Sequence, residues 1–331
     1  MVKVAINGFG RIGRMILRAG INNRKLEFVA INDLTDTKTL AHLFKHDSVY
    51  GRFPKNVSYD EKNLIVDRKR IPVFSEKEPE KLPWKNLKID VVVESTGFFT
   101  TKELASKHIT AGAKKVLISA PAKGGGVKTI VMGVNEKTYD KKTDHIISNA
   151  SCTTNCLAPV AKVLNDNLGI LHGIMTTTHA YTATQKLVDG PDKDLRRARA
   201  AAINIIPTHT GAADAITEVI PELKGKLTGV SIRVPIVAVS LIDLTAEVKR
   251  KTTPEEVNKA FRQAAGSDMK GIIEYSEEEL VSTDIIANPH SAIFDSQLTQ
   301  VIDGSMVKLF AWYDNEWGYS CRMVDVLAMM M

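Results

Sequence analysis

The stretch VKVAINGFGRIGRMILRAG (residues 2–20) decides the expected fold of the first half of the chain. It opens with a short β-branched run typical of a buried strand, and it closes with a helical pattern. Between the two, Gly8, Gly10 and Gly13 form a G-x-G-x-x-G loop. The first glycine permits a tight turn, the second lets backbone approach a pyrophosphate, and the third lets the helix pack closely on the strand. By itself the glycine pattern also fits an ordinary turn, and it favours a dinucleotide-binding unit only together with the next strand.

A second apolar run, FVAIND (28–33), ends in Asp33, 20 residues after Gly13. Dinucleotide-binding domains place at this distance the carboxylate that accepts hydrogen bonds from ribose hydroxyls. Such a carboxylate repels a 2′-phosphate, and the following Leu34 offers no cation or hydroxyl to bind one. We therefore expect NAD rather than NADP.

The rest of the first half alternates strand-like and helical stretches. Further apolar runs cover residues 89–96, 114–120 and 145–148. Their nearly continuous apolar character is typical of a parallel sheet covered on both faces. Residues 57–72 indicate short polar strands and turns inserted between these units. We predict an α/β architecture with a Rossmann-type doubly wound parallel sheet.

The second half has a different pattern. Long runs at 169–180, 227–249 and 305–314 predict long strands of a mostly antiparallel sheet in an α+β domain. Residues 254–265 predict a helix, with Thr253 as its N-cap and a proline at its first position.

The length of 331 residues also favours two domains, because one hydrophobic core rarely serves a chain of this size. We expect an NAD-binding domain at 1–151, completed by a C-terminal helix at about 316–331. The catalytic domain is expected at 152–315.

Composition excludes several classes of function. The net charge of +6 suits anionic ligands, but lysine and arginine are spread along the chain, without the basic stripe of a nucleic-acid reader. Neither a run of roughly 18–20 apolar residues nor a signal-peptide layout is present, so a cytoplasmic protein without a membrane role is expected. Three cysteines argue against a disulfide framework.

A candidate nucleophile lies in SNASCTTNCLAP (148–159), where Cys152 stands between a predicted strand and a predicted helix. A free thiol has a pKa of about 8.5, which a helix N-terminus and a neighbouring imidazolium can lower. His179, in TTTHAYT, is the best partner because it ends a strand in a polar stretch. The residues alone leave an inert thiol and a structural histidine as an equal alternative.

A resemblance favours catalysis. In order along the chain, it is carried by NGFGRIGR, SAPAKGG, SNASCTTNCLAP, THAYTATQ, DLRRARAAA, IIPTHTGAA, SIRVP and WYDNEWGYS. The chain resembles the glyceraldehyde-3-phosphate dehydrogenase family. The resemblance implies phosphorylating oxidation of glyceraldehyde 3-phosphate with NAD, through a thiohemiacetal and a thioester on Cys152. His179 would act as base and later as acid, and the chain would form a homotetramer. Cys156 and Cys321 are expected to be structural.

The same resemblance implies two anion sites, for the substrate phosphate and for inorganic phosphate. Arginine and hydroxyl groups suit both, because they give directed, charge-assisted hydrogen bonds. The matching residues are Ser151, Thr153, Thr182, Arg197, Thr210, Gly211 and Arg233. From the residues alone, each serine or threonine also fits a cap or turn, and Arg196, Arg197 and Arg199 also fit a solvated face.

Further cofactor contacts are implied for Arg11, Ile12, Ser119 and Asn315, and Tyr319 is a candidate for packing on the nicotinamide. Lys77 departs from the family pattern, which commonly has an arginine at the adenine end. Lysine lacks the planar guanidinium, which makes Lys77 the weakest cofactor assignment.

Two alternative functions remain open: a sister sugar-phosphate enzyme such as erythrose-4-phosphate dehydrogenase, and a catalytically silent NAD-binding regulatory protein. No metal site is expected, since His42 and His46 share helical spacing without any supporting ligand motif.

Overall fold

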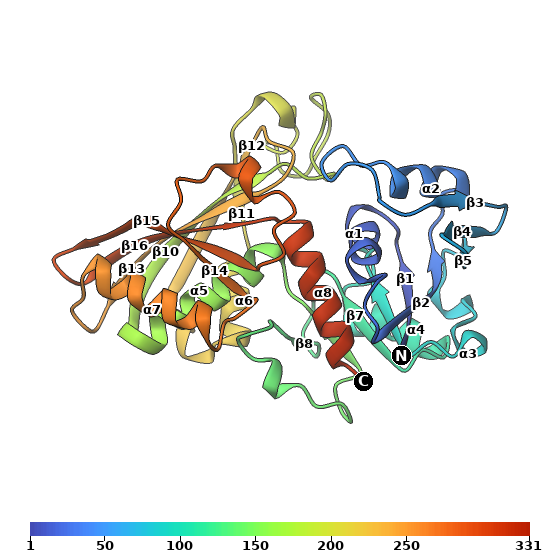
Figure 1. Ribbon diagram of the computed structural model, residues 1–331, viewed down its shortest axis with the longest axis horizontal. Coiled ribbons are helices and arrows are strands. Elements are labelled where there is room, and N and C mark those ends of the chain that lie inside the picture. Colours follow the sequence, from blue (N-terminus) through green and yellow to red (C-terminus); the bar gives the residue numbers. More distant parts are fainter. The chain divides into compact units, whose positions relative to one another are not determined.

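The computed structural model describes the backbone of residues 1–331 and all side chains except that of Asp214. The chain divides into two compact units. Unit 1 comprises Met1–Ile130, Lys137–Ala150 and Ser320–Met331, and unit 2 comprises Val131–Glu136 and Ser151–Tyr319. Each unit contains its own sheet (Figure 1).

In the described backbone, the sheet of unit 1 has nine strands in the order β3-β4-β5-β2-β1-β6-β7-β9-β8. They are β1 (Val2–Asn7), β2 (Leu26–Asn32), β3 (Val57–Tyr59), β4 (Asn63–Val66), β5 (Lys69–Phe74), β6 (Val91–Glu94), β7 (Lys115–Ile118), β8 (Lys128–Thr129) and β9 (Ile146–Ser148). β1 runs parallel to β2 on one side and to β6 on the other. The strand order therefore reverses at β1, where open α/β sheets bind ligands. The predicted doubly wound parallel sheet is confirmed.

The helices of unit 1 are α1 (Arg11–Gly20), α2 (Thr37–Lys45), α3 (Trp84–Leu87), α4 (Lys102–Thr110) and α8 (Trp317–Met329), the last belonging to unit 1 from Ser320 onward. Asp36 caps α2 by accepting from the Thr39 amide, and Thr101 caps α4 in the same way. α1 begins after Gly10 with no side-chain cap. Its first N–H groups therefore face outward for a ligand.

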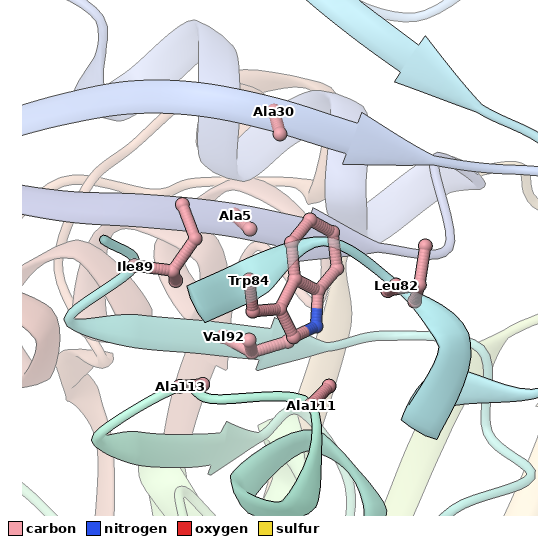
Figure 2. Packing of buried hydrophobic residues seen from close by; sticks show 8 residues of the cluster. All are labelled: Ala5, Ala30, Leu82, Trp84, Ile89, Val92, Ala111 and Ala113. Atoms are coloured by element: carbon pink, nitrogen blue, oxygen red, sulfur yellow. The ribbon is translucent and has the colours of Figure 1, made fainter. Parts of the chain in front are cut away.

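Small residues on the central strands leave room for one large aromatic ring. Figure 2 shows the indole of Trp84 packed among Ala5 of β1, Ala30 of β2 and Val92 of β6. All four residues are buried. Packing in this cluster holds β1, β2 and β6 in place, and the carboxyl ends of these strands lie along one edge of the sheet.

Within the described residues, unit 2 contains a seven-stranded sheet in the order β11-β12-β10-β13-β16-β15-β14. The strands are β10 (Ile170–Ala180), β11 (Ile206–His209), β12 (Leu227–Val234), β13 (Ser240–Val248), β14 (Ile273–Ser276), β15 (Ala292–Ile302) and β16 (Met306–Tyr313). β10–β12 and β14–β15 are parallel pairs, and the other neighbours are antiparallel. The mostly antiparallel sheet is confirmed.

The apolar run at 227–249 forms two strands rather than one. β12 ends before Pro235, which has no N–H for a ladder, and Val239 has a left-handed φ of 71° before β13 begins. The apolar sequence pattern continues through this turn, because its residues Ala238 and Val239 are buried although they lie outside both strands. β12 therefore ends at Val234, one residue after Arg233.

The helices of unit 2 are α5 (Cys152–Leu168), α6 (Ala212–Val219) and α7 (Pro254–Gly266). Thr253 caps α7 through the Glu256 amide, and Pro254 is its first residue, as predicted. Short 3₁₀ helices cover Pro79–Lys81, Glu136–Thr138, Ala201–Ile203, Pro221–Leu223 and Ser282–Ile285. Of the helices in the described part of the chain, none combines the length and apolarity that a membrane span requires.

Candidate active site

The glycine loop of unit 1 depends on backbone that only glycine supplies. Gly8 has a φ of +91°, and a Cβ there would lie 2.7 Å from the Thr96 amide nitrogen. A Cβ on Gly13 would lie 2.2 Å from the Gly8 carbonyl oxygen. Around Gly10, in contrast, nothing lies within 4 Å of the Cβ position. The loop is therefore tight beneath and open above, which fits a pyrophosphate lying on the N-terminus of α1.

A pocket of about 380 Å³ lies at the carboxyl ends of β1, β2 and β6. It is lined by Asn7, Gly8, Gly10, Asn32, Asp33, Leu34, Glu76, Lys77, Ser95, Thr96, Phe98 and Phe99. The Asp33 carboxylate accepts hydrogen bonds from the amides of Phe9 (2.8 Å) and Thr35 (2.9 Å). These bonds fix the carboxylate at the pocket wall and leave it further acceptor capacity for ribose hydroxyls.

Five of the predicted cofactor residues line this pocket or pack under its loop. Gly8, Gly10, Asp33 and Lys77 line the pocket, and Gly13 packs beneath the loop. The Arg11 guanidinium pairs with Asp47, so Arg11 and Ile12 offer the site their amides at the start of α1.

Two other predicted cofactor residues lie outside this lining. Ser119 follows β7, and its amide donates to the Glu94 carbonyl. Asn315 belongs to unit 2, where its side-chain oxygen accepts from the Ser240 hydroxyl at 3.2 Å.

Sequence reasoning missed several lining residues. Asn7, Asn32 and Thr96 stand where β1, β2 and β6 end. Polar residues at the carboxyl ends of adjacent parallel strands meet at one rim. The positions of the strands therefore contained a signal that could have identified these three residues.

In unit 2, Cys152 is the first residue of α5, and Ser151 is its N-cap, accepting from the Thr154 amide at 3.0 Å. His179 reaches the same point from β10, and its Nε2 lies 3.5 Å from the Cys152 sulfur. The predicted thiol and imidazole are therefore in contact. The α5 N-terminus directs its positive dipole at the sulfur.

The far side of the His179 ring touches a residue that the sequence did not connect with it. β10 and β12 run in parallel with His179 opposite Arg233. Arg233 Nη1 lies 2.6 Å from His179 Nδ1 and 3.0 Å from the Ala180 carbonyl oxygen. His179 Nδ1 itself lies 2.7 Å from that oxygen.

Tyr313 is a residue near Cys152 and His179 that the sequence analysis missed. Its buried hydroxyl bonds Thr153 and Thr177, each at 2.9 Å. Its ring meets that of His179 edge-on, with centroids 6.0 Å apart. Tyr313 thus ties α5, β10 and β16 together behind the thiol. Its position in the run WYD gave no signal, since aromatic core residues are common.

The electrostatics correct one expectation from the sequence. Burial raises the pKa of the Cys152 thiol above its usual value, and the positive charge of Arg233 opposes this shift. Burial, reinforced by Arg233, lowers the pKa of His179 to about 3. His179 is therefore neutral in the ligand-free site, and the expected imidazolium is not what activates the resting thiol.

The predicted anion-binding residues lie in three places. Ser151 and Thr153 flank Cys152, with their hydroxyls engaged by Thr154 and Tyr313. Thr182 follows β10 and shares a hydrogen bond of 2.9 Å with Thr184.

The third place is at the end of β11. Arg197 donates to Thr208 at 2.9 Å and lies 3.6 Å from Asp194. Thr210 and Gly211 follow β11 and precede α6, and Gly211 is an N-cap without a side-chain bond. Because β11 pairs with β12, this group is built next to the strand that carries Arg233.

The remaining candidates have structural surroundings. Cys156 is fully buried, and burial raises its pKa well above the usual value. The rings of His42 and His46 lie 5.1 Å apart. Among the described residues, no group of three or more His, Cys, Asp or Glu side chains is arranged to hold a metal ion.

Both units contain segments that match models of known protein families, and nearly the whole chain aligns with known proteins. Residues 2–102 match the family described as glyceraldehyde 3-phosphate dehydrogenase, NAD binding domain, and residues 151–315 match the corresponding C-terminal domain. The chain is 58% identical over 327 residues to glyceraldehyde-3-phosphate dehydrogenase of Geobacillus stearothermophilus, covering 99% of this chain and 97% of the relative. Identity to glyceraldehyde-3-phosphate dehydrogenase 1 of Bacillus subtilis (strain 168) is also 58%, with the same coverage. The Streptomyces coelicolor enzyme is 56% identical, over 98% of this chain and 97% of its own.

Proposed function

Because the chain belongs to the glyceraldehyde-3-phosphate dehydrogenase family, we propose that it converts D-glyceraldehyde 3-phosphate, NAD and inorganic phosphate to 1,3-bisphosphoglycerate and NADH, with Cys152 as nucleophile. The observation that carries this proposal is the 3.5 Å contact between Cys152 Sγ and His179 Nε2 at the start of α5. A nucleophile within reach of a base, at a helix N-terminus, is an arrangement suited to covalent catalysis.

The first step is attack of the Cys152 sulfur on the aldehyde carbon, which forms a thiohemiacetal. The Cys152 amide, at the N-terminus of α5, and His179 are the donors placed to stabilise the developing oxyanion. His179 then removes the hydroxyl proton as the carbon loses its hydride and becomes a thioester. NAD, when bound by unit 1, would supply the hydride acceptor for this step.

In the second step, inorganic phosphate attacks the thioester carbon and the Cys152 sulfur leaves, giving the acyl phosphate. His179 returns a proton to the sulfur. Two anions must be held for this sequence, and we assign the substrate phosphate to Thr182 and Arg233. Ser151, Thr153, Arg197, Thr210 and Gly211 are assigned to substrate or inorganic phosphate.

The cofactor assignment rests on the fit of the glycine loop. The open space over Gly10, the uncapped start of α1 and the fixed Asp33 carboxylate suit a pyrophosphate and a ribose. We assign unit 1 to NAD and unit 2 to the acyl chemistry. Ser119, Asn315 and Lys77 are retained as proposed cofactor contacts, with Lys77 facing the same pocket as Asp33.

We also propose that the chain forms a homotetramer. The face of the unit 2 sheet opposite α5 carries exposed apolar residues, including Ile174 (61% exposed) and Val230 (47%). A loop of the same unit exposes Leu187, Leu195 and Ile203, each by about 80% or more. Apolar surface of this extent favours association with further copies. Light scattering of the purified chain measures the mass directly.

The experiment that tests the function is NADH formation from D-glyceraldehyde 3-phosphate and NAD, with and without phosphate. Sustained NADH formation is expected only with phosphate present. Erythrose 4-phosphate is the matched competitor substrate, and its kcat/KM is expected to be lower. A higher kcat/KM for erythrose 4-phosphate would assign the chain to the sister reaction, and no turnover of either sugar would indicate a silent NAD-binding protein.

A further inference from the structure

Two atoms beside His179 Nδ1, the Ala180 carbonyl oxygen and Arg233 Nη1, make opposite demands on that nitrogen. Nδ1 lies 2.7 Å from the Ala180 carbonyl oxygen, which only accepts, and 2.6 Å from Arg233 Nη1, which only donates. A protonated Nδ1 can donate to the carbonyl but then opposes an N–H of Arg233. A bare Nδ1 can accept from Arg233, whose Nη1 also reaches the carbonyl at 3.0 Å. The two arrangements exclude each other.

With Arg233 in this position, Nδ1 must be the acceptor. The proton of the neutral ring then resides on Nε2, which faces the Cys152 sulfur. A ring in this form can donate to a thiolate or an oxyanion, but it has no lone pair with which to take a proton from the substrate hydroxyl. The base required by the proposed reaction is therefore blocked.

We propose that Arg233 is a positioning residue that holds His179 in the Nε2-protonated tautomer until a phosphate on the substrate draws the guanidinium away. This rests on the proposed function, in which Arg233 binds the substrate phosphate. Once Arg233 leaves, Nδ1 takes up a proton from water and keeps it in an N–H···O hydrogen bond to the Ala180 carbonyl, while Nε2 releases its proton to water. The ring keeps the same number of protons, and Nε2 becomes the base.

The surroundings of Arg233 fit such a movement. Its Nε is buried without a hydrogen-bond partner among the described residues, so the guanidinium is not fully satisfied where it lies. Its side chain is only partly buried, at the end of β12 just before the break at Pro235. A dianionic phosphate offers several charge-assisted bonds in place of contacts to one neutral nitrogen and one carbonyl oxygen. Substrate phosphate would thus favour the displaced position.

The test compares two aldehydes that differ only in the phosphate. D-Glyceraldehyde cannot draw Arg233 away, so the wild-type enzyme is expected to oxidise it slowly. Arg233→Ala removes the block, and kcat/KM for D-glyceraldehyde is expected to rise by about tenfold or more, within the roughly 10²–10⁴-fold contribution of a general base. The same variant is expected to lose activity on glyceraldehyde 3-phosphate. A residue that only binds phosphate would leave the D-glyceraldehyde rate unchanged, and a structural residue would lower it.

Arg262→Ala is the matched control, because Arg262 lies on the exposed face of α7 and pairs with Glu277. Its activity on both aldehydes is expected to equal that of the wild type. A second readout is the tautomer of His179 in enzyme labelled with ¹⁵N-histidine. The ring proton is expected on Nε2 without ligand and on Nδ1 with saturating glycerol 3-phosphate. In Arg233→Ala it is expected on Nδ1 in both states.

The outcomes separate the tautomer lock from the proposed function. If the wild type oxidises glyceraldehyde 3-phosphate but Arg233→Ala oxidises D-glyceraldehyde no faster, the tautomer lock is wrong and the proposed function stands. An unchanged ¹⁵N pattern on adding glycerol 3-phosphate to the wild type would likewise overturn the lock alone. If the wild type oxidises neither aldehyde, the proposed function itself fails.

Discussion

Each unit of the molecule contains a buried histidine with an N–H donor against Nδ1, and the two differ in what faces Nε2. In unit 1, Trp84 Nε1 donates to His108 Nδ1 at 3.1 Å, and His108 Nε2 donates to the Glu94 carboxylate at 3.0 Å. In unit 2, Arg233 lies against His179 Nδ1, and Nε2 faces the Cys152 sulfur.

In the His108 network, both ring nitrogens have buried hydrogen-bond partners, and we call this network closed. Glu94 also accepts from Asn7 at 2.6 Å and from the Thr96 amide at 2.8 Å, so its charge is compensated inside the core. Both side chains of the His108–Glu94 pair are fully buried, and the donor on Nδ1 is held by the packing shown in Figure 2. His179 instead has the Arg233 guanidinium at Nδ1 and the Cys152 sulfur at Nε2, and neither of these partners is a carboxylate. Both histidines are buried, so burial does not distinguish them, whereas the partners of their two ring nitrogens do.

The largest effect is expected from removing the group that His179 faces. Cys152→Ser should reduce phosphorylating turnover on the order of 10⁴-fold or more, because a hydroxyl is a far weaker nucleophile than a thiol. NAD binding, measured by calorimetry, should persist, since the glycine-loop pocket lies within unit 1. Normal turnover in this variant would remove Cys152 from the mechanism.

His179→Asn should slow acylation by about 10²–10⁴-fold, the usual contribution of general acid–base catalysis. Single-turnover NADH formation measures this step. The same change at the closed network, His108→Asn, should leave the acylation rate within about twofold of the wild type. Equal kinetic losses in both variants would end the distinction between the two histidines.

His108→Asn should instead act on stability. It removes the donor to a buried carboxylate, so the free energy of unfolding should fall by about 3 kcal/mol. Urea denaturation followed by circular dichroism measures this change. An unchanged unfolding midpoint would show that Asn7 and Thr96 suffice to hold the Glu94 charge.

Acid should destabilise the native state through His179. Its pKa is lowered to about 3 by burial and Arg233, against about 6.5 in an unfolded chain. Between these values the unfolded chain binds more protons, so stability falls as the pH falls. Between pH 6.5 and 4.5 the wild type should lose about 2–3 kcal/mol more than His179→Asn. Parallel curves for the two proteins would contradict the depressed pKa.

The smallest effect is expected from Trp84→Phe, which keeps a smaller aromatic ring in the core and removes the donor to His108 Nδ1. The free energy of unfolding should fall by about 1–2 kcal/mol, the cost of one lost buried hydrogen bond and slightly altered packing. A loss much larger than this would assign the role of Trp84 to packing alone.

Features that depend on neighbours in the chain were predictable from the sequence. The glycine loop, the Thr253 cap and the end of β2 at Asp33 each follow from residues close together, because turns, caps and strand ends are local. The break in the run 227–249 was not predicted, because the apolar residues 238 and 239 continue the hydrophobic pattern through a turn.

The contact between His179 and Arg233 was beyond reach for a different reason. It depends on the register of two parallel strands more than 50 residues apart, which no local pattern specifies. The depressed pKa of His179 follows from the same contact and from burial. The residue types of the site could therefore be selected by resemblance, whereas its charge state required the fold.

The central claim is that the substrate becomes covalently attached to Cys152. Mixing the enzyme with glyceraldehyde 3-phosphate and NAD in the absence of phosphate, followed by acid quenching and peptide mass spectrometry, tests it directly. A 3-phosphoglyceroyl group on the peptide containing Cys152, with one equivalent of NADH per chain, is the expected result. NADH formation with Cys152 unmodified, or with the acyl group on another residue, would contradict this claim.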